Sequence, residues 1–351
     1  MSINLFYIVS LLLSVMVVYF SSNWLVIWIL VEASTLCIVI LLSGAPTPRA
    51  IESSVKYYII QALASILLLV GILSKGVIDG SVCLFSNYNL VSYLLILVSL
   101  LIKLATFPNP FWFVDVVGGV ALSRGIYVIV FSKLIPVYLY YLVGGPLNLV
   151  LVVVGLSSVL YGSFLGINQS STRKIIALSS ISHMGWFILS FPVLTGFCCF
   201  FIFSSYIFML GPLVWSLSFL SLTSLGKAKN AYFNSSLLSG ILISLFSLGG
   251  FPPLLGFFYK WVMFYGLIDG GFLLVSGSLV FLSLVSLFFY LQISFSLVSI
   301  YWPGLKVYSL WGVSNSVFSL SLSSLILFLS FFIVQVVGGP AFLSLWASWV
   351  L

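Results

Sequence analysis

Apolar runs of about 20 residues, the length that a helix needs to cross a lipid bilayer, follow one another along almost the whole chain. Hydrophobic residues make up 62% of the sequence and charged residues only 5%, whereas soluble domains carry roughly 25% charged residues. We therefore expect an all-α polytopic membrane protein with about 11 transmembrane helices and short connections. The expected spans are 3–20, 24–43, 53–74, 88–121, 125–143, 147–167, 174–192, 197–224, 236–268, 272–300 and 316–337.

The first segment, MSINLFYIVSLLLSVMVVYF, is expected to be a span of the mature chain rather than a targeting peptide. It has no basic region followed by a small-residue cleavage site, and it lacks the Arg- and Ser-rich amphipathic pattern of a transit peptide. Such an apolar chain without an import signal is typical of synthesis inside the target organelle, or of a bacterial protein.

The charged residues of the connections separate by sign when successive loops are assigned to alternate sides of the membrane. One side receives only Lys75, Asp79 and Asp269, and the other receives Arg49, Lys56, Arg124, Arg173, Lys174, Lys227, Lys229 and Lys306. This asymmetry follows the positive-inside rule, so we expect the N-terminus on the basic side, cytoplasmic or matrix, and the C-terminus opposite. The net charge of +7 is thereby explained by topology and indicates no nucleic-acid partner.

Several classes of site are not expected in this chain. Its four cysteines are Cys37, Cys83, Cys198 and Cys199, and no C-x-x-C spacing occurs, so a zinc or iron–sulfur site is not expected. No phosphate-binding glycine loop, dinucleotide fingerprint or haem motif is present. We therefore expect neither a metal nor a cofactor on this chain.

Two of the expected spans are too long for one helix and too short for two helices with a loop. Segment 88–121 contains IKLATFPNPFW, and segment 236–268 contains SLGGFPPLLGFFYKW. Each fits two half-helices joined by unwound backbone, which at membrane depth must be buried in protein or line a wet cavity. The residues expected to break the helices are Pro108, Pro110, Gly249, Gly250, Pro252 and Pro253.

The positions of these two interrupted spans predict an internal repeat within a single membrane domain, 1–351. They are the fourth and the ninth spans, and an odd separation of five spans inverts the second copy in the membrane. We expect inverted repeats over 1–143 and 147–300, with an extra C-terminal helix and tail over 316–351. Matching interrupted helices in two halves point to a transport site.

Five ionisable residues lie well inside expected spans: Glu32, Lys103, Lys133, His183 and Lys260. A lysine at the centre of a bilayer costs about 2.5–3.5 kcal/mol on insertion scales, so three of them indicate a function. The pattern predicts a proton relay in which Glu32 and Lys103 pair. Two alternatives remain open: a single mid-span lysine can serve a structural pair or lie at an interface, and His183 can be a packing residue.

Several stretches resemble subunit 2 of the NADH dehydrogenases, the antiporter-like membrane subunit family of mitochondrial respiratory complex I. The resemblance covers nearly the whole chain in order. Its motifs are NWLVIWILVEASTL (23–36), PRAIESSVKYYIIQALAS (48–65), INQSSTRKIIALSSISHMGW (167–186) and SLGGFPPLLGFFYKW (247–261).

The resemblance implies the site residues one by one. Glu32 matches the mid-membrane glutamate of the family, Lys103 its partner lysine, Lys133 the central lysine, His183 the histidine and Lys260 the distal lysine.

The chain departs from the family pattern after Lys103, where it reads KLATFPNPFWFVD. Pro110 replaces a histidine, Val114 a proline and Asp115 a glutamate, so Asp115 is only a tentative relay residue. Because proline cannot transfer a proton, any role of that histidine is absent here.

What the resemblance implies about function is a proton-translocating subunit driven by quinone reduction elsewhere in the complex. NAD, FMN, iron–sulfur clusters and ubiquinone would then belong to the assembled complex. Neighbours would include subunits 4 and 4L and lipid, with cardiolipin as a candidate, in the mitochondrial inner membrane. The alternatives are a cation/proton antiporter subunit and a structural membrane subunit without transport.

Overall fold

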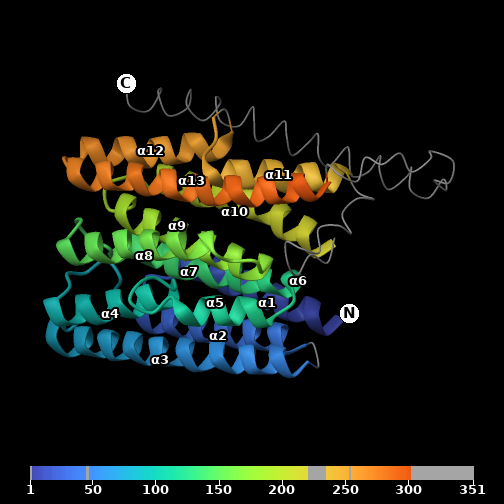
Figure 1. Ribbon diagram of the computed structural model, residues 1–351. Coiled ribbons are helices and arrows are strands. Elements are labelled where there is room, and N and C mark those ends of the chain that lie inside the picture. The colour runs from blue at the N-terminus through green and yellow to red at the C-terminus, as the bar shows by residue number, and fades with distance from the viewer. Residues whose placement is uncertain (1, 45–46, 220–234, 253, 302–351) are drawn as a thin grey trace. The chain divides into compact units, whose positions relative to one another are not determined.

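A computed structural model describes residues 2–44, 47–219, 235–252 and 254–301, and all regular structure among them is helical (Figure 1). The expected span 316–337, the tail 338–351, Pro253, Lys227, Lys229 and Lys306 lie outside these residues. The helices are α1 (Ser2–Phe20), α2 (Trp24–Ser43), α3 (Pro48–Asp79), α4 (Leu90–Lys103), α5 (Phe111–Gly119), α6 (Leu122–Ile126), the π-helix η1 (Tyr127–Phe131), α7 (Ser132–Val143), α8 (Leu149–Ile167), α9 (Thr172–Ser190), α10 (Gly196–Phe219), α11 (Ser235–Gly249), α12 (Leu255–Asp269) and α13 (Leu273–Tyr301).

By length and composition, six stretches of these helices can cross a membrane, namely Trp24–Ser43, Pro48–Asp79, Leu122–Val143, Leu149–Ile167, Gly196–Ser218 and Leu273–Val298. Shorter apolar helices include Asn4–Phe20, Leu90–Lys103 and Ser239–Gly249. An all-helical membrane fold is therefore the architecture of the described residues.

Serines are common in these apolar helices, and they satisfy their own hydroxyls. Ser99 donates to the carbonyl of Ile96 at 2.6 Å, and Ser180 donates to that of Ala177 at 2.8 Å. This local bond removes the cost of an unpaired hydroxyl in an apolar surrounding, so a serine-rich span remains compatible with a membrane.

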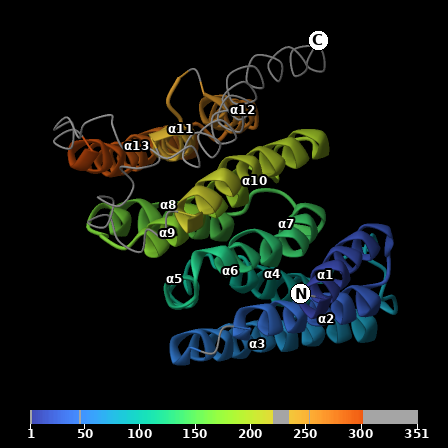
Figure 2. The same cartoon turned by 90° about the vertical axis from the view of Figure 1, so that its right-hand side faces the viewer.

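The described residues divide into two compact units. The first takes its residues from Met1–Gly162 and Ile176–Pro192, and the second from Ser163–Ile175 and Val193–Leu351. In the first, α1, α2 and α3 lie side by side (Figure 2), and α3 extends along both α4 and α5. In the second, α10 and α13 each pack against both α11 and α12 (Figure 1).

Helix α3 is long because capping residues mark its two ends and no proline interrupts its interior. The Thr47 side chain accepts from the N–H of Ala50, and Pro48 occupies the first turn, where its missing N–H costs nothing. Gly80 follows the last turn in the left-handed conformation, at φ 66°. Because α3 is one uninterrupted helix, it can line both halves of an interrupted neighbour.

Lys75 has a structural role that its assignment to a connection did not foresee. It lies in the last turns of α3, is fully buried, and donates to the carbonyls of Cys83 at 2.6 Å and Ser86 at 3.2 Å. Its Nζ also lies 3.6 Å from the ring centroid of Tyr88. These bonds hold the turn after α3 in place, and Trp24 joins it through its N–H to the Val82 carbonyl at 3.0 Å.

Both interrupted spans consist of two helices separated by irregular backbone. Residues 104–110 separate α4 from α5, and Ala105 has φ 60°, which is strained for a residue with a side chain. Residues 250–254 separate α11 from α12, and Gly250 has φ 82°, a conformation that glycine adopts without strain. At each break the chain leaves backbone carbonyls free of helical partners, and these are available to side chains.

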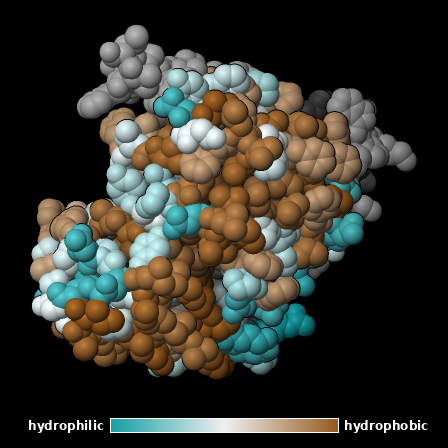
Figure 3. All heavy atoms as spheres, turned by 90° about the vertical axis from the view of Figure 1, so that its left-hand side faces the viewer, coloured by the Kyte–Doolittle hydropathy of each residue, from teal (hydrophilic) through white to brown (hydrophobic). Residues whose placement is uncertain are grey.

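Large apolar side chains remain exposed on the described helices. Phe20 is 86% exposed, Val77 86% and Leu274 92%. Figure 3 shows one face on which brown apolar areas are broad and teal hydrophilic areas are small. Exposed apolar surface on this scale is typical of helices that face lipid.

Candidate functional site

The first part of the candidate site joins α2, α3 and α4. Lys103 is the last residue of α4 and is 1% exposed, and its Nζ donates to the backbone carbonyl of Gln61 at 3.4 Å. Glu32 of α2 is half-buried and lies close enough for its charge to act on Lys103. The C-terminal end of α4 also favours a cation, because the helix dipole is negative there. Glu32 thus acts on Lys103 only through its charge, because no ion pair joins the two side chains among the described residues, and their pairing stays a prediction.

The surroundings of Lys133 contain neutral groups. Lys133 is the second residue of α7 and is 1% exposed. Its Nζ lies 3.3 Å from the hydroxyl of Ser180 and 4.3 Å from the ring centroid of Phe113. No carboxylate forms an ion pair with it among the described residues. A buried ammonium with only a hydroxyl and an aromatic face around it is weakly compensated.

The helix that carries Lys133 is irregular on both sides of it. The π-helix η1 ends at Phe131, two residues before Lys133, and Pro136 lies inside α7, three residues after it. π-Bulges are frequent at functional sites, because the extra residue changes the direction of the side chains that follow. The sequence contained no signal for η1.

His183 lies on α9, on the face that carries the partner of Lys133. It is 2% exposed, and it is separated by three residues from Ser180, so both side chains lie on one side of the helix. A Cβ at Gly185, two residues further along α9, would collide with the hydroxyl of Ser158. The lack of a side chain at Gly185 thus allows α8 to approach α9 closely at this level of the helix.

Lys260 belongs to the second unit, where it contacts the break between α11 and α12. Its Nζ donates to the carbonyl of Gly249 at 2.9 Å, and the side chain is partly exposed. This carbonyl ends α11, so the cation also meets the negative end of that helix. A Cβ at Gly250 would lie 3.0 Å from Cδ of Lys260, which leaves little room for any other residue there.

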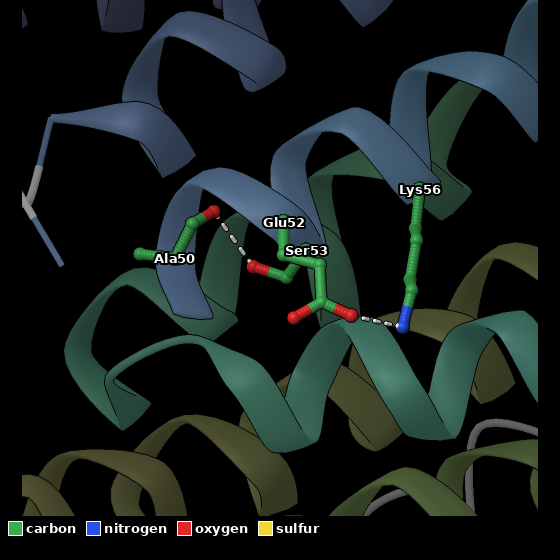
Figure 4. Close-up of polar contacts among 4 residues, drawn as sticks. All are labelled: Ala50, Glu52, Ser53 and Lys56. Atoms are coloured by element: carbon green, nitrogen blue, oxygen red, sulfur yellow. Dashed lines mark hydrogen bonds and ion pairs between the residues drawn. The ribbon is translucent and has the colours of Figure 1, made fainter. Parts of the chain in front are cut away.

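Asp115 is exposed on α5, apart from the buried residues. It lines a pocket of about 160 Å³ together with Arg49, Glu52, Ser53, Lys56 and Gly119. Glu52 and Lys56 form an ion pair at 2.6 Å one turn apart on α3, and the Ser53 hydroxyl donates to the Ala50 carbonyl at 2.8 Å (Figure 4). The pocket is lined by side chains of both positive and negative charge, so its walls are hydrophilic and do not favour ions of one sign.

The structure also identifies residues that the sequence analysis missed. Tyr57, Gln61 and Trp112 are buried, and each has a polar atom without a partner among the described residues. Gln61 interrupts the apolar run IIQALAS, and this isolated amide was the only available signal. No group of three or more His, Cys, Asp or Glu residues that could hold a metal occurs within the described part of the chain.

Comparisons with known proteins give a consistent result for the sequence. The family model described as NADH:quinone oxidoreductase/Mrp antiporter, TM, matches residues 21–287. The chain is 34% identical over 291 residues to NADH-ubiquinone oxidoreductase chain 2 of Oryctolagus cuniculus, covering 82% of this chain and 83% of the relative. It is 33% identical over 322 residues to the protein of the same name from Xenopus laevis, covering 90% and 92%.

Solved structures show the same fold at lower identity. A chain of respiratory complex I from Thermus thermophilus superposes with a TM-score of 0.79 and 21% identity, covering 93% of this chain and 77% of that one. A chain of the Mrp complex from Dietzia superposes with a TM-score of 0.67 and 20% identity, covering 78% and 56%. The fold is therefore shared by respiratory and antiporter assemblies.

Proposed function

The chain belongs to the NADH-ubiquinone oxidoreductase chain 2 family, within the NADH:quinone oxidoreductase/Mrp antiporter transmembrane group, and from this premise we propose that it is a proton-translocating membrane subunit of complex I. It works as part of the enzyme NADH:ubiquinone reductase and performs no redox chemistry itself. NAD, FMN, the iron–sulfur clusters and ubiquinone are carried by other subunits.

The observation that carries this proposal is the environment of Lys133. Its ammonium is buried in a membrane helix next to a hydroxyl and an aromatic ring. A lysine that served only stability would be expected to have a carboxylate or several carbonyls, as Lys75 has its two carbonyls. Weak compensation suits a group that gains and loses a proton.

The proposed relay consists of Glu32, Lys103, Lys133, His183 and Lys260, with Asp115 as a tentative member near one surface. When Glu32 and Lys103 are close, each partly neutralises the other. Separating this pair leaves Lys103 uncompensated and favours release of its proton towards Lys133. Quinone reduction elsewhere in the complex supplies the energy, and the path continues through His183 to Lys260.

We further propose about 11 transmembrane helices, with inverted repeats over 1–143 and 147–300 and an extra element over 316–351. The packing supports this division. Helix α3 precedes one interrupted span and packs along both α4 and α5, and α10 precedes the other and packs along both α11 and α12. Corresponding helices thus have corresponding neighbours.

The proposed location is the mitochondrial inner membrane, with the N-terminus on the matrix side and the C-terminus on the intermembrane-space side. The relatives from Oryctolagus and Xenopus support a multi-pass inner-membrane protein. Other subunits of the membrane arm are the expected partners, including subunits 4 and 4L, and cardiolipin is the expected lipid.

A cation/proton antiporter is the second candidate function, because the Mrp complex shares the fold. A sodium carrier needs several convergent carboxylates and carbonyls, whereas Glu32 is the only carboxylate within α2. A structural subunit without transport is the third candidate, and it predicts that the buried lysines are dispensable.

The first test replaces Lys133 by Met, which keeps the length of the side chain and removes the proton-carrying group. In the assembled enzyme in vesicles, we expect NADH-driven proton uptake to fall by roughly ten-fold or more, since loss of a proton-transfer group costs about 10²–10⁴ in its step. Lys174→Met, at an exposed position of α9, is the matched control and should be silent. Unchanged proton uptake in Lys133→Met would refute the relay.

A further inference from the structure

One buried face of α3 leads from the charged pocket to the Glu32–Lys103 pair. Ser53, Tyr57 and Gln61 are spaced four residues apart, so they lie above one another on the helix, and all are at most 3% exposed. Ser53 lines the pocket at one end. The backbone of Gln61 accepts from Lys103 at the other end.

Four buried polar atoms around this face lack a partner among the described residues. They are Oε2 of Glu32, the hydroxyl of Tyr57, Nε2 of Gln61 and Nε1 of Trp112. The rings of Tyr57 and Trp112 lie 6.0 Å apart, and the charge of Glu32 acts on both Tyr57 and Lys103. These atoms therefore belong to one cluster rather than to four separate sites.

The chemistry of the four atoms suits water. The amide of Gln61 and the indole of Trp112 are donors, Glu32 is an acceptor, and the tyrosine hydroxyl can do both. A water molecule accepts two hydrogen bonds and donates two, so it can link these groups to one another. Buried polar groups are rarely left unpaired, and ordered water is their usual partner where protein groups are absent.

The outer end of the face is already hydrophilic. The pocket of about 160 Å³ has charged walls from Arg49, Glu52, Lys56 and Asp115. A Cβ at Gly119 would lie 3.0 Å from that of Ser53, so α5 approaches α3 closely at the wall of the pocket. Tyr57, one turn further along this face, is the next buried polar side chain after Ser53.

We propose that Tyr57 and Gln61 hold a file of water molecules that joins the charged pocket to Glu32 and Lys103. Each water, and the hydroxyl of Tyr57, accepts one proton and passes another one on, so no net charge remains on the path and no co-reactant is needed. Tyr57 and Gln61 are thus positioning residues for the water. This inference rests on the proton-translocating function proposed above.

The test uses Tyr57→Phe and Gln61→Leu in the assembled enzyme. Both changes remove a water ligand, and Gln61→Leu leaves the backbone carbonyl that Lys103 uses. We expect NADH-driven proton uptake to fall by roughly ten-fold and its solvent deuterium isotope effect to rise, since the water file would be broken. Tyr58→Phe, at a 42% exposed neighbouring position, is the matched control, and Gln61→Asn should restore part of the activity.

The outcomes separate this inference from the proposed function. If Lys103→Met abolishes proton uptake while Tyr57→Phe and Gln61→Leu keep the normal rate and isotope effect, the water file is refuted and the function stands. If a variant fails to assemble, a high-resolution density map of the unmodified complex tests the water file directly. Ordered water within hydrogen-bond distance of the Tyr57 hydroxyl and Gln61 Nε2 supports the inference, and its absence at both atoms overturns it.

Discussion

At the scale of single residues, the groups that contact each buried lysine side chain distinguish its role. Lys75 donates to two carbonyls of a turn and serves the fold. Lys133 meets a hydroxyl and a ring, and Lys103 meets one carbonyl and the charge of Glu32. Residue type alone does not separate these cases, because all three are buried lysines in apolar helices.

Glu32 and Lys103 should behave as an energetically coupled pair. We expect Glu32→Gln to slow proton uptake, because it leaves the buried Lys103 ammonium without a counter-charge. In the double variant with Lys103→Met, the fold-reduction in proton uptake should be smaller than the product of the fold-reductions of the two single variants. This difference corresponds to an interaction energy of about 0.5–3 kcal/mol. The measurement is turnover and proton uptake of the two single variants and the double variant. Strictly multiplicative effects would contradict the pair.

At the scale of elements, the break between α11 and α12 supplies the backbone carbonyl that Lys260 binds. The carbonyl of Gly249 is free of a helical partner because the chain turns at Gly250, and Lys260 donates to it. A continuous helix would use that carbonyl internally and leave Lys260 to face an apolar surface. The break is therefore what makes a lysine tolerable at that position.

Gly250 is expected to be essential for this element. Gly250→Ala should destabilise the assembled enzyme by about 1 kcal/mol or more, because alanine is strained at φ 82° and its Cβ would press on Lys260. Thermal inactivation and proton uptake of the assembled enzyme measure the effect. Gly277→Ala in α13 is the control, because a Cβ there meets no atom within 4 Å. Equal behaviour of the two variants would refute the role of the break.

At the scale of the whole molecule, the similarity to NADH-ubiquinone oxidoreductase chain 2 makes this chain a membrane subunit of a larger enzyme complex. Its broad apolar surface is interrupted only by small hydrophilic areas on the face in Figure 3. No metal-binding cluster occurs among the described residues.

The assignment as a complex I subunit predicts which proteins co-purify with this chain in a mild detergent extract. We expect it to co-purify with a large flavin-containing assembly that oxidises NADH, because its function depends on quinone chemistry in other subunits. Size-exclusion chromatography with NADH oxidation followed across the fractions is the measurement. Isolation as a free monomer, or with a complex that exchanges sodium for protons, would favour the antiporter alternative.

The sequence by itself determined the membrane class and the candidate relay residues, because both depend on local chemistry. Long apolar runs dictate helices, and a charge such as Lys133 or Glu32 within a run is conspicuous without any structure. The similarity to NADH-ubiquinone oxidoreductase chain 2 then indicated a role in complex I. Asp115 was predicted only as a tentative relay residue after the first break, and the structure adds that its side chain is exposed on α5.

Only the tertiary structure decided which side chains meet. Gln61 touches Lys103 because α3 runs along α4, and Ser180 touches Lys133 because α9 packs near α7. The buried place of Lys75 depends on the turn that folds back over it. The contacts of Lys103 and Lys133 join residues 42 and 47 positions apart in the chain, so they follow from packing between helices, which the periodicity within each helix does not specify.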